Sequence, residues 1–378
     1  MTLLKELNKR IYERIKKDPH NPDSLISFNE ALDLYKEDYE ELVSLAEIVR
    51  KFYHQNYVLV HVINNIRNGN CGEDCGYCAQ RKSASGIPTY SLKSEEEILK
   101  EAEEAKRNGA YRYCLVTAGR GINPKMAQFY ANIIKRIIEE IGIKVCLSAG
   151  IVEDPTSAKI LAEAGLDRYN HNLNTSRRHY PNIATTHTYE DREKTLKNIS
   201  QSSIGLCSGV IVGMGETLED RIEVGLKLNE FRVESIPVNF FLPVPGHQIQ
   251  NYETFTPEEC LKILSLYRLM NPQAELRIAA GRELYLKEKQ PIGLRVANSL
   301  FVSGYLNVRG SSAYETIKMI YLNGFQLDPK TETTIQALKD QILKEMDSQE
   351  KEQMLIYRKE MELKTLKELR PYFDHAKN

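Results

Sequence analysis

The chain has 378 residues, of which 42% are hydrophobic and 27% charged, enough to bury the core of one large domain or two ordinary ones. Its 51 Lys and Arg residues balance 52 Asp and Glu residues, and a formal net charge of -1 gives no electrostatic reason to expect a nucleic acid or an acidic membrane as partner. No apolar stretch reaches the roughly 20 residues that span a bilayer and the charged N-terminus does not resemble a signal peptide, so we expect a cytoplasmic protein with reduced cysteines.

The first 55 residues alternate charged and apolar positions at helical spacing, which predicts a helical lead-in over residues 1–55. From residue 56 to 328, short β-branched or apolar runs alternate with amphipathic stretches, which is typical of βα units around a parallel sheet. The expected strands cover residues 57–64, 113–119, 143–150, 168–173, 205–215, 235–243, 275–281 and 298–304. Eight strands over roughly 250 residues favour an α/β fold of the closed (β/α)8 TIM-barrel type over an open doubly wound sheet. A six-stranded partial barrel would give a similar pattern.

The last segment, residues 329–378, is strongly charged. Ile335, Leu338 and Ile342 recur in it at helical spacing, which predicts a charged helical C-terminal extension. We expect its apolar stripe to pack on the barrel or on a second subunit. A coiled coil that binds a partner is the alternative.

A loop directly after the first expected strand, NNIRNGNCGEDCGYCAQ, places Cys71, Cys75 and Cys78 within eight residues. Three thiolates can hold three irons of a 4Fe-4S cluster, and the missing fourth leaves one iron open to another ligand. Zinc is the alternative, but structural zinc sites usually close four positions, and only His61, inside the first strand, lies nearby. Because the carboxyl ends of barrel strands form the active-site face, the loop lies where a barrel enzyme would use it.

Three further cysteines fall inside expected strands: Cys114 in the second, Cys146 in the third and Cys207 in the fifth, with Arg277 in the seventh. Alternate residues of a barrel strand point inward, so these four side chains could converge in the lumen. Each cysteine alone could be inert core, as we expect of Cys260 on an amphipathic helix. A buried arginine is harder to explain in that way, since it stays protonated and needs an anionic partner.

The C-x3-C-x2-C spacing, with the aromatic Tyr77 before the last cysteine, resembles the cofactor site of the radical S-adenosylmethionine superfamily. The chain is similar to the biotin synthase family over residues 35–328, in the segments YCLVTAGRG, KVCLSAG, GLCSGVIVGMGET, LRIAAGRE, DRYNHNLNTS, HTYEDR, SIPVNFF and GLRVANSLFV. This resemblance implies a 4Fe-4S cluster whose open iron chelates S-adenosylmethionine, and an electron that cleaves this cofactor to a 5'-deoxyadenosyl radical. It also implies a 2Fe-2S cluster on the three strand cysteines and Arg277, which donates sulfur as dethiobiotin is converted to biotin.

Further site residues follow from the same resemblance. It implies that Asn172 contacts both S-adenosylmethionine and dethiobiotin, that Arg192 binds the methionine carboxylate, and that Asn239 contacts dethiobiotin. Backbone around Ile211 is expected near the adenine. Asn174 stands where some family members carry an Asp that binds the ribose hydroxyls, and its amide would bind them with less charge assistance.

Plainer alternatives exist for several of these residues. Asn172 and Asn239 could be strand-end hydrogen bonders, and Arg192 could form a surface salt bridge. His171 is expected to be packed or hydrogen-bonded rather than a ligand, and His187 could be either.

The resemblance also implies a homodimer and an electron donor such as flavodoxin or ferredoxin. One competing function is another radical S-adenosylmethionine enzyme of the same subgroup, such as a methylornithine synthase or a hydrogenase maturase. The other is a non-catalytic iron–sulfur or zinc-binding protein.

Overall fold

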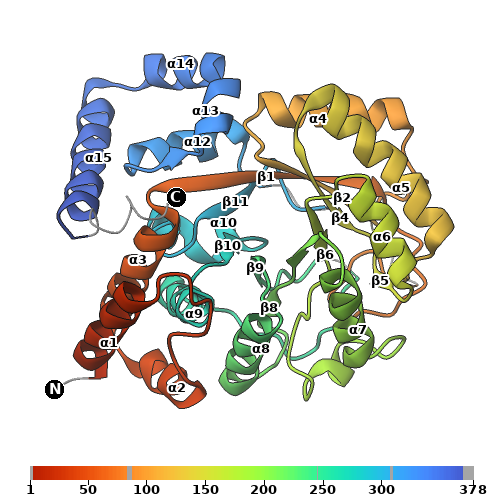
Figure 1. Ribbon diagram of the computed structural model, residues 1–378, viewed down its shortest axis with the longest axis horizontal. Helices are drawn as coiled ribbons and strands as arrows, with labels where there is room; N and C mark the ends of the chain where they lie inside the picture. Colours follow the sequence, from red (N-terminus) through yellow and green to blue (C-terminus); the bar gives the residue numbers. More distant parts are fainter. Residues whose placement is uncertain (1–2, 83–86, 245, 307–309, 369–378) are drawn as a thin grey trace.

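A parallel barrel forms the centre of the molecule in a computed structural model that describes residues 3–82, 87–244, 246–306 and 310–368 (Figure 1). The strands are β1 (Tyr57–Arg67), β2 (Arg112–Thr117), β3 (Gly121–Ile122), β4 (Lys144–Ser148), β5 (Ile151–Val152), β6 (Arg168–Asn170), β7 (Gly205–Cys207), β8 (Val210–Val212), β9 (Ser235–Phe240), β10 (Glu275–Ile278), β11 (Ser299–Val302) and β12 (Gln326–Leu327). β3 and β5 form a separate two-stranded sheet, and β12 pairs with β1.

The barrel closes because its sheet returns to its first strand. Neighbours pair in the order β10-β11-β1-β2-β4-β6-β7-β9, all in parallel, and β9 pairs again with β10. β8 also pairs with β9, so β7 and β8 together fill one position. Within the described residues, eight strand positions therefore form a closed barrel. The expected (β/α)8 fold is confirmed, and the six-stranded alternative is wrong.

One expected strand, residues 205–215, is interrupted in the middle. Gly209 separates β7 from β8, and a Cβ placed on it would lie 1.9 Å from the carbonyl oxygen of Pro237 on β9. The backbones approach so closely there that only glycine fits. The split leaves Cys207 at the end of one short strand and Ile211 in the next.

Helices surround the barrel, and further helices precede it and follow it in the chain (Figure 1). Before β1 come α1 (Leu3–Lys17), α2 (Phe28–Lys36) and α3 (Tyr39–His54). Around and between the strands lie α4 (Glu95–Arg107), α5 (Pro124–Arg136), α6 (Pro155–Glu163), α7 (Tyr189–Ser200), α8 (Leu218–Glu230), α9 (Pro257–Met270), α10 (Arg282–Leu286), α11 (Gln290–Gly293) and α12 (Ala313–Leu322). Short helical turns cover Ile137–Ile141, Tyr180–Asn182 and Lys287–Lys289.

After β12 the chain continues in α13 (Pro329–Thr334), α14 (Gln336–Glu345) and α15 (Ser348–Glu368), and α15 packs against α12. Residues 369–378 of the expected extension lie outside the described residues. The division into segments 1–55, 56–328 and 329–378 stays a prediction. No helix in the described ranges is long and apolar enough to cross a membrane.

Capping boxes fix where two helices near the barrel mouth begin. At the start of α7, the Thr188 hydroxyl accepts a hydrogen bond from the backbone of Asp191, whose carboxylate accepts one from Thr188 N. Thr217 and Asp220 repeat this exchange at the start of α8. The first box puts Arg192 in the first turn of α7.

Candidate functional site

A cavity of about 390 Å³ lies at the carboxyl ends of the barrel strands. Both cysteine groups line it, the loop trio of Cys71, Cys75 and Cys78 and the strand trio of Cys114, Cys146 and Cys207. The other expected site residues also line it, namely Tyr77, Asn172, Asn174, Arg192, Ile211, Asn239 and Arg277. The fold thus gathers into one cavity residues that are spread over two hundred positions of the sequence.

The loop trio is held by backbone hydrogen bonds that close the loop on itself. Cys71 N donates to Gln80 O at 3.1 Å, Gly69 N donates to Gln80 Oε1 at 3.1 Å, and Cys78 N donates to Cys75 O at 3.0 Å. Burial raises the pKa of the Cys75 thiol, and it raises that of Cys78 to about 12. A lone thiolate is therefore disfavoured here, and a coordinating cation would have to stabilise it.

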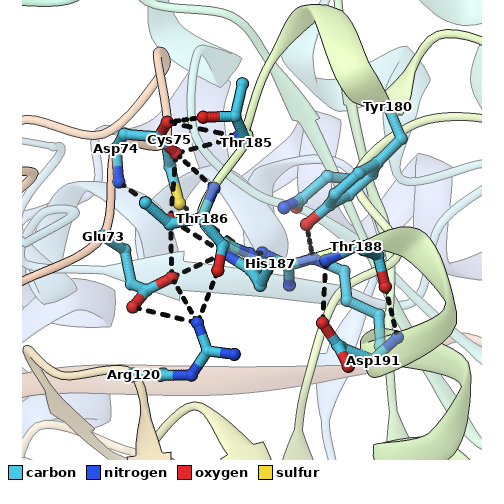
Figure 2. Close-up of polar contacts among 12 residues, drawn as sticks. Glu73, Asp74, Cys75, Arg120, Tyr180, Thr185, Thr186, His187, Thr188 and Asp191 are labelled. Atoms are coloured by element: carbon cyan, nitrogen blue, oxygen red, sulfur yellow. Dashed lines mark hydrogen bonds and ion pairs between the residues drawn. The ribbon is translucent and has the colours of Figure 1, made fainter.

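Two acidic residues between the cysteines tie this loop to the segment before α7 (Figure 2). The Asp74 carboxylate accepts hydrogen bonds from the backbone of Thr185 at 3.0 Å and of Thr186 at 3.2 Å. The Glu73 carboxylate accepts one from Thr186 Oγ1 at 2.7 Å and lies 3.3 Å from Arg120 Nη1. Neither acid stood out in the sequence, although their position inside the cysteine motif was a signal that they serve it.

His187 joins the same contacts, and its partners define its tautomer. Its Nδ1 lies 2.7 Å from Glu73 Oε2, which only accepts, and its Nε2 lies 2.9 Å from Arg192 Nη2, which only donates. Burial, together with the charge of Arg192, lowers the pKa of His187. The imidazole is thus neutral with its proton on Nδ1, and Nε2 also lies 4.0 Å from Cys75 Sγ.

Arg192 is a buried cation without an acidic partner. It donates to Asn172 O at 2.7 Å, to Tyr77 Oη at 3.2 Å and to the hydroxyl of Tyr180, besides His187. Among the described residues no carboxylate pairs with it, and it is only 6% exposed. The surface salt bridge is wrong. An uncompensated guanidinium on a cavity wall attracts anions.

The loop after β6 brings two asparagines to the cavity. Asn172 Oδ1 accepts a hydrogen bond from Gly209 N at 3.0 Å, and its Nδ2 has no partner within the described ranges. Asn174 has a left-handed backbone, with φ 69°, and its Nδ2 donates to Tyr77 Oη at 2.6 Å. Asn174 O in turn accepts from Ile211 N at 2.8 Å, so both asparagines and Ile211 are held together.

Asn239 and His171 complete the walls. Asn239 bridges two backbone segments, since Nδ2 donates to Val210 O at 3.0 Å and Oδ1 accepts from Ala280 N at 3.2 Å. Both ends of its amide therefore hydrogen-bond to the backbone, as in the alternative of a strand-end hydrogen bonder. His171 is buried, with a backbone bond to Cys207 O at 2.9 Å, and burial lowers its pKa far enough to keep the ring neutral.

The strand trio lies in the lumen. Cys114, Cys146 and Cys207 form a buried cluster with the rings of Phe301 and Tyr305. Hydrogen bonding with Cys146 lowers the pKa of the two other thiols, while that of Cys146 itself is raised. The three thiols are thus neighbours in the lumen and pack against the two aromatic rings.

Arg277 lies beside the strand trio and points into the barrel. It is 2% exposed; its Nε donates to Ser299 Oγ at 3.0 Å and its Nη2 to Ser235 Oγ at 2.9 Å. Its guanidinium carbon lies 4.8 Å from the centre of the Phe301 ring. The anionic partner that the sequence analysis required is Glu275, which also pairs with Nη2.

Glu275 organises several charges at the floor of the barrel. Its carboxylate lies 2.8 Å from His61 Nε2, 2.9 Å from Arg112 Nη1 and 2.9 Å from Ser299 Oγ. Burial opposes ionisation, but His61, Arg112 and Arg277 lower the pKa of Glu275 well below its ordinary value. Arg112 also pairs with Asp167 at 2.7 Å. Sequence reasoning missed this network, although an acid two residues before Arg277 had to share its inward face.

Two other sequence expectations concern residues outside the cavity wall and the kind of metal. Cys260 is fully buried in α9 as part of the apolar core, as expected. In the described ranges, no three His, Cys, Asp or Glu side chains are arranged to hold a single metal ion.

Comparisons with known proteins agree on the family. The profile of the Radical SAM superfamily matches residues 65–227, and that of the Biotin and Thiamin Synthesis associated domain matches residues 237–326. A biotin synthase of Leptospira interrogans is 55% identical over 277 residues, which is 73% of this chain and 79% of that protein. One from Acaryochloris marina is 49% identical over 298 residues, or 79% and 86% of the two chains.

Solved structures share the fold. A methylornithine synthase superposes with a TM-score of 0.69 at 17% identity, covering 88% of this chain and 99% of that chain. The FeFe-hydrogenase maturase of Carboxydothermus hydrogenoformans gives 0.71, also at 17% identity, covering 97% and 91%. At such low identity the likeness concerns the fold alone.

Proposed function

Because this chain belongs to the biotin synthase family of radical S-adenosylmethionine enzymes, we propose that its cavity converts dethiobiotin to biotin by inserting sulfur between two saturated carbons. One observation carries the proposal: two cysteine trios, one on a loop and one on three strands, line the same cavity. A radical source and a sulfur source can then act on one substrate held between them.

The residues present fit the groups that this chemistry needs. Cys71, Cys75 and Cys78 would hold a 4Fe-4S cluster with one iron free for S-adenosylmethionine, whose carboxylate suits the unpaired charge of Arg192. The strand trio and Arg277 would hold an auxiliary 2Fe-2S cluster. When bound, these groups supply a radical that removes hydrogen from saturated carbon and a sulfide that replaces it.

The chain's own residues bind, orient and exclude water. Asn172 offers a free Nδ2 to the cavity, while Asn174 and the backbone around Ile211 would accept the nucleoside of the cofactor. Asn239 would contact the substrate only by sharing an amide that already serves the backbone. Phe301 and Tyr305 shield the strand trio, which limits access of water and reductants to a reactive carbon.

Anaerobic reconstitution tests the proposal. The protein is loaded with iron and sulfide and incubated with dethiobiotin, S-adenosylmethionine and a reductant, and both biotin and 5'-deoxyadenosine are measured. We expect both products. Formation of 5'-deoxyadenosine without biotin would assign the chain to another radical reaction, and failure to form either would reject the radical chemistry.

We also propose a homodimer that receives electrons from a flavodoxin or ferredoxin. The family resemblance supports both statements. Light scattering should give twice the mass of one chain, and a reduced flavodoxin should replace the chemical reductant in the assay. A monomeric mass, or no turnover with either protein donor, contradicts the respective statement.

A further inference from the structure

At the floor of the barrel, the carboxylate of Glu275 contacts Arg277, Arg112 and His61. We propose that Glu275 is the positioning residue of the auxiliary site: it holds Arg277 so that one guanidinium nitrogen stays free for the cluster, and it offsets part of the arginine's charge. This inference rests on the proposed auxiliary cluster at the strand trio.

The first argument is geometric. Arg277 Nη2 is engaged by Ser235, Glu275 and His61, and Nε by Ser299. Ser299 in turn donates to Glu275 Oε1 at 2.9 Å, so the carboxylate fixes the arginine directly and through a serine. Among the described residues none accepts a hydrogen bond from Nη1. That nitrogen is the one left for the cavity, which Arg277 lines.

The second argument is the balance of charge. Glu275 is the only carboxylate within the described residues that pairs with Arg277, and it also pairs with Arg112. Arg112 has its own second acid in Asp167, at 2.7 Å, whereas Arg277 has none. Loss of the Glu275 charge therefore leaves Arg277 facing the cluster with its full positive charge, and that change acts on the cluster's electronic state.

The third argument is the place of these residues in the barrel. Glu275 and Arg277 are two positions apart on β10 and point to the same side, one layer apart. His61 on β1 lies 2.8 Å from Glu275. With Arg112 on β2 and Ser299 on β11 as further partners, the acid connects its own strand to three others beneath the strand trio.

The test compares anaerobically reconstituted full-length variants by absorption and Mössbauer spectra and by iron content. In Glu275→Gln we expect the loop cluster to keep its spectrum and the auxiliary spectrum to shift, since both the position and the net charge of Arg277 change. The double variant should match Arg277→Met alone, since Glu275 acts through the arginine. Asp167→Asn, which removes an acid from Arg112 but not from Arg277, is the matched control and should keep both spectra.

Several results overturn the inference: a wild-type auxiliary spectrum in Glu275→Gln, the same shift in Asp167→Asn, an additive double variant, or loss of both clusters in Glu275→Gln alone. If Glu275→Gln does not fold, Glu275→Gln with Arg112→Met removes one cation together with the acid and is compared with Arg112→Met. Full iron in a variant lacking all three strand cysteines would instead reject the auxiliary cluster, and with it the proposed function.

Discussion

Glu73 Oε2 lies 2.7 Å from His187 Nδ1, and this contact connects the cysteine loop to the start of α7 across more than one hundred residues of sequence (Figure 2). The other ring nitrogen of His187, Nε2, contacts Arg192 Nη2. Glu73 and His187 therefore link the cysteine loop to Arg192.

Removing that carboxylate should loosen the loop. In Glu73→Ala, His187, Thr186 and Arg120 lose their shared acceptor, and we expect iron to leave the loop cluster about tenfold faster, a size typical for residues that orient metal ligands. Release is followed by absorbance with a ferrous chelator. Glu73→Gln keeps an acceptor and should lose iron at a rate between those of Glu73→Ala and the wild type; equal rates for all three contradict the role.

Replacing any loop cysteine with Ala should abolish formation of 5'-deoxyadenosine, since the radical-generating cluster loses an iron ligand. Cys260→Ala is the control, because that thiol is buried in α9 outside the cavity and its loss should cost only about 1 kcal/mol of stability. Product is quantified by chromatography. Wild-type yields from Cys71→Ala, Cys75→Ala or Cys78→Ala sink the assignment of the loop.

Replacing the strand cysteines should separate cofactor cleavage from sulfur insertion. Variants at Cys114, Cys146 or Cys207 are expected to keep the loop cluster and form some 5'-deoxyadenosine, but to lose auxiliary iron and make no biotin. Iron and sulfide analysis checks this. If a variant lacking all three cysteines kept its full iron content, they would be ordinary core residues.

Asn174→Asp probes the proposed contact of residue 174 with the ribose of S-adenosylmethionine. Aspartate also adopts the left-handed backbone that Asn174 has, with φ 69°, and a carboxylate binds hydroxyls through stronger, charge-assisted hydrogen bonds. We expect the KM for S-adenosylmethionine to fall about fivefold, which corresponds to ~1 kcal/mol. Asn174→Ala should raise the KM and destabilise the fold by about 1–2 kcal/mol. Unchanged KM values in both variants speak against a ribose contact.

Asp220 gives a prediction about pH. Burial alone would raise the pKa of this carboxyl, but hydrogen bonds from Ser176, Arg178 and Thr217 lower it to about 2. Since the folded pKa is depressed, the stability that the carboxylate adds is complete above its unfolded pKa and is lost as the pH falls through the folded value. Asp220→Asn should cost about 2 kcal/mol at neutral pH.

Urea unfolding of wild type and Asp220→Asn checks this difference. It should stay constant on acidification to about pH 5 and shrink steadily below about pH 4. Asp191 occupies the same position in the capping box at the start of α7 and is the matched control residue. A difference that persists undiminished at the lowest pH shows that Asp220 acts through packing and not through its charge.

A feature of the site or of the fold could be predicted from the sequence when the residues that form it are close together in the chain. The loop trio lies in one short segment. The strand cysteines could be assigned because alternate residues of every barrel strand point into the same lumen. Glu275 was missed because its partners His61 and Arg112 come from strands whose register no single sequence reveals. Residues 205–215 were read as one strand because a glycine's close backbone contact depends on the neighbouring strand, not on its own segment.

The two cysteine trios differ in when they come into existence. Three cysteines on one loop can meet iron as soon as that short segment has been synthesised, whatever the state of the rest of the chain. Cys114, Cys146, Cys207 and Arg277 lie on β2, β4, β7 and β10, so their site exists only after contacts across most of the sequence have formed. The ring closes only when β11, the last of the barrel strands in the chain, pairs with both β10 and β1. The inner site therefore depends on the whole barrel, whereas the loop trio depends on one short segment of the chain.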